Sequence, residues 1–161
     1  FLARFPHVRV VAVEPDPDTF RMLERNTRVY GERCTCVQAG VWPEPTSLRV
    51  VDTASGDGRA WARGVEVVTG EPHPGDIRAV SIDELMRQAG VDCVTLLKVD
   101  IEGGERELFA RQTENWLGRV ERIAIELHGE ECTAVYRTAV DKTGLLSCLA
   151  GGLTWSVRPG L

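Results

Sequence analysis

Val8-Arg9-Val10-Val11-Ala12-Val13, followed at once by Glu14-Pro15-Asp16-Pro17, is the stretch that decides the fold. The part before Glu14 is short, mostly β-branched and nearly all apolar, which predicts a strand that is covered on both faces. A helix is expected next, with Asp16 as its N-cap and Gly31 as its stop. A second strand is predicted at 34–41, so the chain starts as strand, helix, strand.

The same alternation continues toward the C-terminus. Further strands are predicted at 91–99, 120–127 and 153–157, and further helices at 81–89, 106–117, 132–140 and 145–149. Strands that alternate with helices indicate an α/β fold, in which a mostly parallel, Rossmann-like sheet carries helices on both faces. Ligands of such sheets bind outside the carboxyl ends of the strands, so chemistry is expected in the segments that directly follow strands.

Residues 42–80 interrupt this alternation. The region is rich in Pro and Gly, and only short strands are predicted in it, at 47–51 and 65–68. A long irregular region in a compact domain is typical of a lid or a binding insertion. We therefore predict one domain over residues 1–161, with a loop and short-strand insertion at about 42–80 that covers an acceptor pocket.

Composition and charge exclude several classes of protein. The chain has 161 residues, of which 43% are hydrophobic and 27% charged, as in an ordinary globular domain. No apolar run approaches the roughly 18 residues of a membrane-spanning helix, so no membrane partner is expected. The net charge of −5 disfavours binding to nucleic acid, which needs clustered Lys and Arg. The five cysteines contain no Cys-x-x-Cys motif, so we expect reduced thiols in a cytoplasmic protein rather than zinc or redox chemistry.

Three polar clusters directly follow predicted strands, at Glu14–Asp16, Asp100–Glu105 and Glu126–His128. In the first cluster, Glu14 is well placed to accept hydrogen bonds from both hydroxyls of a ribose. The alternative is a surface carboxylate near a helix N-terminus, which the helix dipole also favours.

The second cluster, Asp100-Ile101-Glu102-Gly103-Gly104-Glu105, is the densest. Its glycines let the backbone approach a ligand closely, and its carboxylates can orient a hydroxylated or cationic ligand or hold a divalent metal. The alternative is that these acidic residues only occupy the start of a helix and bind no ligand. The spacing is not diagnostic of a metal, and none is predicted. Lys98 lies in the preceding strand and is expected to pair with Asp100 or Glu126, because an unpaired lysine in an apolar strand is costly.

The third cluster ends at His128, whose pKa near neutrality makes it a candidate general base. We expect Asp100 or Glu102 to orient this histidine or the acceptor. A histidine that only caps a loop is the alternative.

These stretches resemble the FkbM family of S-adenosylmethionine-dependent methyltransferases. The resemblance is carried by Val10–Pro17, Ser81–Leu85, Leu96–Glu105 and Ile125–His128. The most specific part is the Lys-Val-Asp-Ile-Glu-Gly-Gly-Glu segment that ends at Glu105, where the family typically carries Lys-x-Asp-x-Glu-Gly-x-Glu. The resemblance implies a class I methyltransferase sheet.

The resemblance also implies residue roles. Glu14 is expected on the ribose of S-adenosylmethionine, residues 38–40 near its adenine, and Asp100 with its neighbours near the methionine end and the acceptor. The full set expected to bind the cofactor is Glu14, Pro15, Asp16, Gln38, Ala39, Gly40 and Asp100, and the set expected to act in catalysis is His128, Asp100, Glu102 and Lys98.

Members of this family typically methylate hydroxyl oxygens of sugars, polyketides and other secondary metabolites. We therefore expect an S-adenosylmethionine-dependent O-methyltransferase that acts on the hydroxyl of a small molecule. One alternative is a nicotinamide-dependent oxidoreductase on a related sheet, which needs a Gly-x-Gly-x-x-Gly turn after its first strand. The other alternative is that the chain is a non-catalytic, truncated remnant. The sequence indicates no oligomeric state.

The family pattern begins with a strand and a glycine-rich turn of the form Asp-x-Gly-Ala-Asn-x-Gly, and this turn binds the methionine part of the cofactor. No stretch of this sequence matches that turn. The strand would lie between the strands predicted at 8–13 and 91–99, so a sheet without it has two open edges. We therefore expect the natural protein to be longer than this sequence. The alternative is that the chain is a truncated remnant that cannot bind the cofactor.

Overall fold

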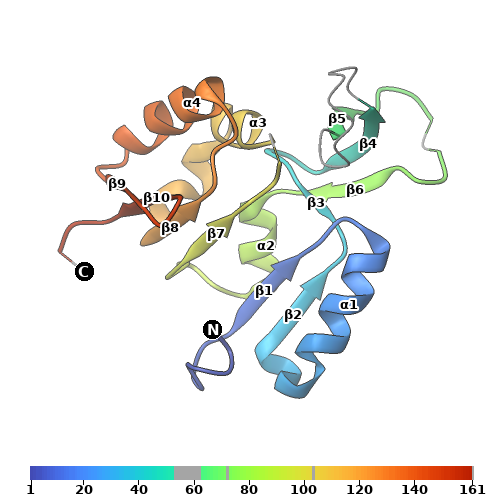
Figure 1. Cartoon of the computed structure of the whole chain (residues 1–161), viewed down its shortest axis with the longest axis horizontal. Helices are drawn as coiled ribbons and strands as arrows, with labels where there is room; N and C mark the ends of the chain where they lie inside the picture. The colour runs from blue at the N-terminus through green and yellow to red at the C-terminus, as the bar shows by residue number, and fades with distance from the viewer. Residues whose placement is uncertain (53–62, 72, 103, 161) are drawn as a thin grey trace.

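The computed structural model describes residues 1–52, 63–71, 73–102 and 104–160 and shows helices and strands in alternation (Figure 1), which confirms the α/β class. The strands are β1 (Val10–Val13), β2 (Cys34–Val37), β3 (Gly40–Val41), β4 (Thr46–Asp52), β5 (Arg63–Val67), β6 (Ile77–Val80), β7 (Leu97–Val99), β8 (Arg122–Ile125), β9 (Leu146–Ala150) and β10 (Leu153–Val157). The α-helices are α1 (Pro17–Thr27), α2 (Ile82–Ala89), α3 (Glu105–Ala110) and α4 (Glu130–Asp141).

The described strands form three sheets, in the orders β1–β2, β7–β8–β10–β9 and β3–β6–β4–β5. Three strand pairs are parallel (β1–β2, β7–β8 and β3–β6), and the other four are antiparallel. The sheets are therefore mixed, and the mostly parallel arrangement is not confirmed. Among the described strands, β1 pairs with β2 alone and β7 with β8 alone, so the β-structure is divided at the place where the family pattern puts its first strand.

The first strand–helix–strand unit forms as its sequence predicts. The Asp16 carboxylate accepts hydrogen bonds from the backbone N–H groups of Asp18 and Thr19, at 3.0 and 2.8 Å, and so caps α1. The helix ends at Thr27 and continues as a 3₁₀ helix, within which Gly31 adopts a φ of 55°. Residues 38 and 39 then separate two short strands, so the single strand predicted at 34–41 is wrong in its second half.

The segment predicted as a helix at 145–149 is instead strand β9. It pairs antiparallel with β10 through a two-residue connection, Gly151-Gly152, whose φ angles are 61° and 81°. Positive φ at both central residues is what the common two-residue hairpin turn requires, and glycine adopts it without a steric cost. The two-glycine turn therefore makes residues 146–150 a strand of a hairpin, and the prediction of a helix at 145–149 is wrong.

The helix predicted to reach Leu117 also ends early, at Ala110. Gln112 has a φ of 57°, a left-handed conformation that an α-helix cannot continue through. Two short 3₁₀ segments follow, and Trp116 and Leu117 are buried there.

The predicted insertion at 42–80 contains the two strands expected in it, which are β4 and β5, and also β6, which the sequence reading missed. Residues 53–62 and residue 72 lie outside the described residues. A separate cluster of buried side chains, Trp42, Leu48 and Ala79, supports this sheet. Gly40 packs closely against it, since a Cβ at this position would lie 3.2 Å from Leu48 Cδ1.

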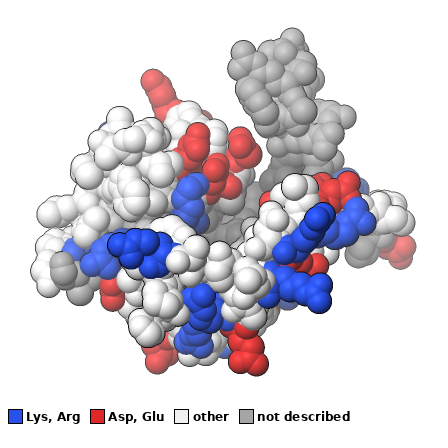
Figure 2. Space-filling model, turned by 60° about the horizontal axis from the view of Figure 1, so that its bottom comes forward, with Lys and Arg blue, Asp and Glu red and all other residues white. Residues whose placement is uncertain are grey.

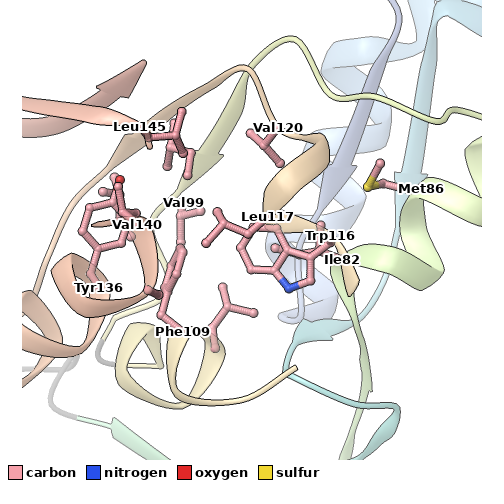
Figure 3. Packing of buried hydrophobic residues seen from close by; sticks show 14 residues of the cluster. Ile82, Met86, Val99, Phe109, Trp116, Leu117, Val120, Tyr136, Val140 and Leu145 are labelled. Carbon is pink, nitrogen blue, oxygen red and sulfur yellow. The ribbon is translucent and has the colours of Figure 1, made fainter. Parts of the chain in front are cut away.

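The main core lies between the β7–β8 region and the helices that follow these strands (Figure 3). Phe109 on α3 meets Tyr136 on α4 edge-on, with ring centroids 4.8 Å apart, and meets Trp116 at 5.5 Å. The hydroxyl of Tyr136 lies 2.5 Å from Ser156 Oγ on β10, which gives its buried polar end a hydrogen-bond partner. Helix α3 is thus fixed against α4, and α4 against the sheet.

No helix in the described part of the chain combines the length and the apolar character needed to cross a bilayer.

Replacing Phe109 by Ala is expected to lower the free energy of unfolding by about 3–5 kcal/mol, because the change removes a fully packed ring and leaves a cavity. Urea denaturation followed by tryptophan fluorescence measures the loss. Phe1→Ala is the matched control, because Phe1 is 68% exposed and its loss should matter by no more than about 0.5 kcal/mol. Equal losses for the two variants would contradict the packing role of Phe109.

Candidate active site

The segments that follow β7 and β8 leave the sheet at one edge. The two strands are parallel, with Val99 opposite Ile125, and the backbone N–H of Glu126 donates to the carbonyl of Val99 at 3.1 Å. Because the pairing is parallel, the loop that starts at Asp100 and the loop that leads to His128 emerge side by side. The clusters Asp100–Glu105 and Glu126–His128 therefore lie at the same edge.

His128 is held between two carboxylates. Its Nδ1 lies 2.9 Å from Oε1 of Glu105, and its Nε2 lies 3.5 Å from Oε2 of Glu102. The Glu105 side chain is fully buried, at 0% exposed, whereas Glu102 is 59% exposed. The backbone of Glu102 adopts a φ of 51°, in the left-handed region that non-glycine residues seldom occupy. His128 thus has one nitrogen against a buried carboxylate and the other on the exposed side.

The sequence predicts an orienting role for Asp100 or Glu102 and none for Glu105, whereas Glu105 makes the shortest contact with His128. Glu105 stands in a run of acidic residues that all look alike in sequence. The usable signal was its place at the start of α3, four residues before the buried Phe109.

Lys98 and Asp100 form the expected ion pair, with Nζ 3.0 Å from Oδ2. Both side chains are well exposed, at 46% and 41%, so solvent screens the pair and it contributes little to stability. The premise that Lys98 is a buried charge in need of a partner is therefore wrong, although the contact itself is present.

One donor set at this edge is close enough to share a cation. Ligand atoms of Asp100, Glu102 and His128 all lie within 4.8 Å of one another. Carboxylate and imidazole groups suit a divalent ion. However, two of the three side chains are exposed and Asp100 is already paired with Lys98, so the geometry alone does not assign an ion to the site.

The pKa of His128 reflects these neighbours. Partial burial works to lower it, but the hydrogen bond to Glu105 and the negative charges of Glu105, Glu102 and Glu126 outweigh burial and raise the pKa above its ordinary value of 6.5. The imidazole therefore keeps its proton to a higher pH than an unperturbed histidine does, because the neighbouring carboxylates stabilise the charged ring.

A second group of predicted residues lies at the carboxyl ends of β1 and β2. The backbone N–H of Glu14 donates to the carbonyl of Val37 at 3.1 Å, which places Glu14 beside Gln38. Oε1 of Glu14 accepts a hydrogen bond from the backbone N–H of Asp16 at 2.8 Å, and the Asp16 carboxylate serves as the cap of α1. Gln38 is exposed, as Pro15 is, whereas Ala39 and Gly40 are buried. Figure 1 shows β1, β2 and β7 pointing the same way, so both groups lie at the same end of their strands.

A sequence model of the methyltransferase FkbM domain matches residues 1–138 of the 161-residue chain. The chain belongs to the FkbM family of methyltransferases. Neither the curated proteins nor the solved structures contained a significant match to it.

For this FkbM-family chain the predicted site residues thus fall into two groups, one after β1 and β2 and one after β7 and β8. Gly103, which belongs to the second group in sequence, lies outside the described residues. A shallow recess of about 400 Å³ borders the second group and is lined by His128, Gly129 and Cys132, among others.

NMR titration is expected to give His128 a pKa above 6.5, and Glu105→Gln should lower this pKa because it removes the nearest negative charge while burial persists. The chain has only three histidines, so the signal that disappears in His128→Gln identifies the residue. Glu114→Gln, on the exposed surface, is the control and should leave the titration unchanged. A His128 pKa that does not respond to Glu105→Gln would contradict this pairing.

Proposed function

We propose that this FkbM-family chain is an S-adenosylmethionine-dependent O-methyltransferase that acts on a hydroxyl group of a small molecule. The observation that carries the proposal is His128, which follows β8 and has the buried Glu105 carboxylate at one ring nitrogen and the exposed Glu102 carboxylate near the other. An alcohol oxygen must lose its proton as it is methylated, and a neutral imidazole at this position can receive that proton.

The residues after β1 and β2 fit the nucleoside part of the cofactor. Glu14 is half-buried at a strand end, with a carboxylate that can accept hydrogen bonds from ribose hydroxyls. Ala39 and Gly40 directly follow Gln38 in the chain, and we propose their backbone as the neighbour of the adenine ring. We propose Pro15, Asp16 and Gln38 as neighbours of the same ligand, with Asp16 acting through its cap of α1.

S-adenosylmethionine, when bound, supplies an activated methyl group. The protein then has to align the acceptor oxygen with that group and accept a proton, and alignment of this kind is worth roughly 7–11 kcal/mol. We assign proton transfer to Nε2 of His128, and orientation of the acceptor to Asp100 and Glu102, with Lys98 holding Asp100. A proton taken up by His128 is stabilised by the Glu105 carboxylate and is returned to solvent afterwards.

The recess beside His128 supports a small acceptor. Its volume of about 400 Å³ lies within the range of small-molecule pockets. Figure 2 shows acidic and basic side chains interspersed over the drawn face rather than one continuous basic area, which favours such an acceptor over the phosphate backbone of a nucleic acid. We propose a cytoplasmic location, where the five cysteines would stay reduced.

We further infer that the two-stranded sheet β1–β2 and the sheet β7–β8–β10–β9 are two parts of one class I methyltransferase sheet. Support comes from the parallel pairing within β1–β2 and β7–β8 and from their common direction in Figure 1.

Calorimetric titration is expected to show binding of S-adenosylhomocysteine and none of NAD. Glu14→Ala should weaken this binding by about 10- to 100-fold, because hydrogen bonds to a charged group are lost. Glu24→Ala is the matched control, since Glu24 is an exposed glutamate on α1. Heat with NAD alone would favour an oxidoreductase, and heat with neither compound would favour the non-catalytic alternative.

His128→Gln is expected to lower the turnover number by about 10²–10⁴-fold, the usual contribution of a general base, with little change in affinity for S-adenosylhomocysteine. Release of S-adenosylhomocysteine from a panel of small alcohols measures turnover, and His73→Gln is the control because His73 is exposed and far from the site in sequence. Turnover should persist in EDTA. A loss that Mg²⁺ restores would contradict the base role, because the ion would then compete for the same nitrogen.

A further inference from the structure

Glu105 is the buried charged residue of the candidate site. Its side chain is fully buried at the start of α3, on the same short helix as the core residues Leu108 and Phe109. An ionised carboxylate in such a place needs hydrogen-bond donors to offset the loss of water. Its carboxylate accepts from the backbone N–H of Ile101, at 3.3 Å, and forms a hydrogen bond with Nδ1 of His128, at 2.9 Å.

The direction of the second hydrogen bond decides where the histidine carries its proton. When Glu105 is ionised its carboxylate only accepts hydrogen bonds, so in that state Nδ1 of His128 is the donor. A neutral imidazole has a single N–H, so Nε2 is left with a lone pair. That nitrogen lies on the side of the exposed Glu102, 3.5 Å from its carboxylate, where an acceptor hydroxyl can reach it.

We propose that Glu105 is a positioning residue that fixes His128 as the Nδ1–H tautomer, so that Nε2 is the proton-accepting atom. This inference rests on the proposed function, in which the acceptor O–H proton moves to Nε2 as the oxygen–methyl bond forms and the methyl–sulfur bond breaks. The imidazolium that results has both nitrogens protonated and faces the Glu105 carboxylate, and it later releases the Nε2 proton to water.

A purely structural role is the competing explanation, since a buried carboxylate–histidine pair also holds α3 against the loop after β8. The two explanations differ in what they say about the neutral ring. A positioning role requires that neutral His128 has one tautomer in the resting protein. It also requires that Glu105 affects turnover only through His128. A structural role requires neither.

The first test is ¹⁵N NMR of the whole chain with labelled histidine rings, recorded at a pH above the His128 titration. His128→Gln assigns the signals, as only three histidines contribute. The expected wild-type pattern is a protonated Nδ1 and an unprotonated Nε2. Glu105→Leu should shift His128 toward the Nε2–H tautomer that free histidine favours, and Glu102→Gln should leave the wild-type pattern in place. A wild-type His128 protonated on Nε2 would overturn the proposal without any variant having to fold.

The second test is a double-mutant cycle in turnover. Glu105→Gln is expected to lower kcat by at least about 10-fold, and by no more than the 10²–10⁴-fold that a general base contributes, with KM nearly unchanged. In the His128→Gln background the same change should have no further effect. An equal loss in both backgrounds would overturn positioning in favour of a structural role. The expected NMR pattern in a chain that transfers no methyl group would leave the tautomer assignment standing and refute the proposed function instead.

Discussion

The parallel pairing of β7 with β8 is the constraint on which the candidate site depends. Glu105 and His128 are 23 positions apart in the chain, and they meet because the loops after these strands leave the sheet at the same edge. A one-residue slip in this register would turn every side chain of β8 to the other face. The site therefore has little tolerance for a change in how these two short strands pair.

Helix α3 joins the site to the hydrophobic core. Its first residue is Glu105, and within the same six-residue helix Phe109 packs against Tyr136 of α4. The loop that carries His128 leads directly into α4, so both members of the carboxylate–histidine pair are anchored by one helix–helix contact. A substitution that loosens the packing between α3 and α4 would for this reason displace the backbone that carries Glu105 and His128, although the site residues themselves are unchanged.

Local sequence rules predicted the elements whose signals lie close together in the chain. The cap at Asp16, the capped helix from Ser81 to the left-handed Gly90, and the strand at 153–157 all formed as expected. The contact between Lys98 and Asp100 followed from their positions two residues apart near a strand end.

Features that depend on tertiary packing could not be predicted in the same way. Glu105 is buried and Glu102 is exposed, and this difference is decided by how α3 packs on α4. Strand β9 lies where a helix is predicted at 145–149, because its pairing with β10 across Gly151-Gly152 decides its structure. Strands β1 and β7 belong to separate sheets, and composition and periodicity do not predict which strands pair.

The sheet β3–β6–β4–β5 has a core of its own, and that core is small. Among the described side chains it consists of Trp42, Leu48 and Ala79, with Ile77 packed against them, whereas the cluster around Phe109 is several times larger. Segments with few buried apolar contacts open locally at a lower free energy than the rest of a protein. Local opening of this sheet would break the contacts of its own described cluster, whereas the contacts around Phe109 that support the His128 site belong to the other cluster.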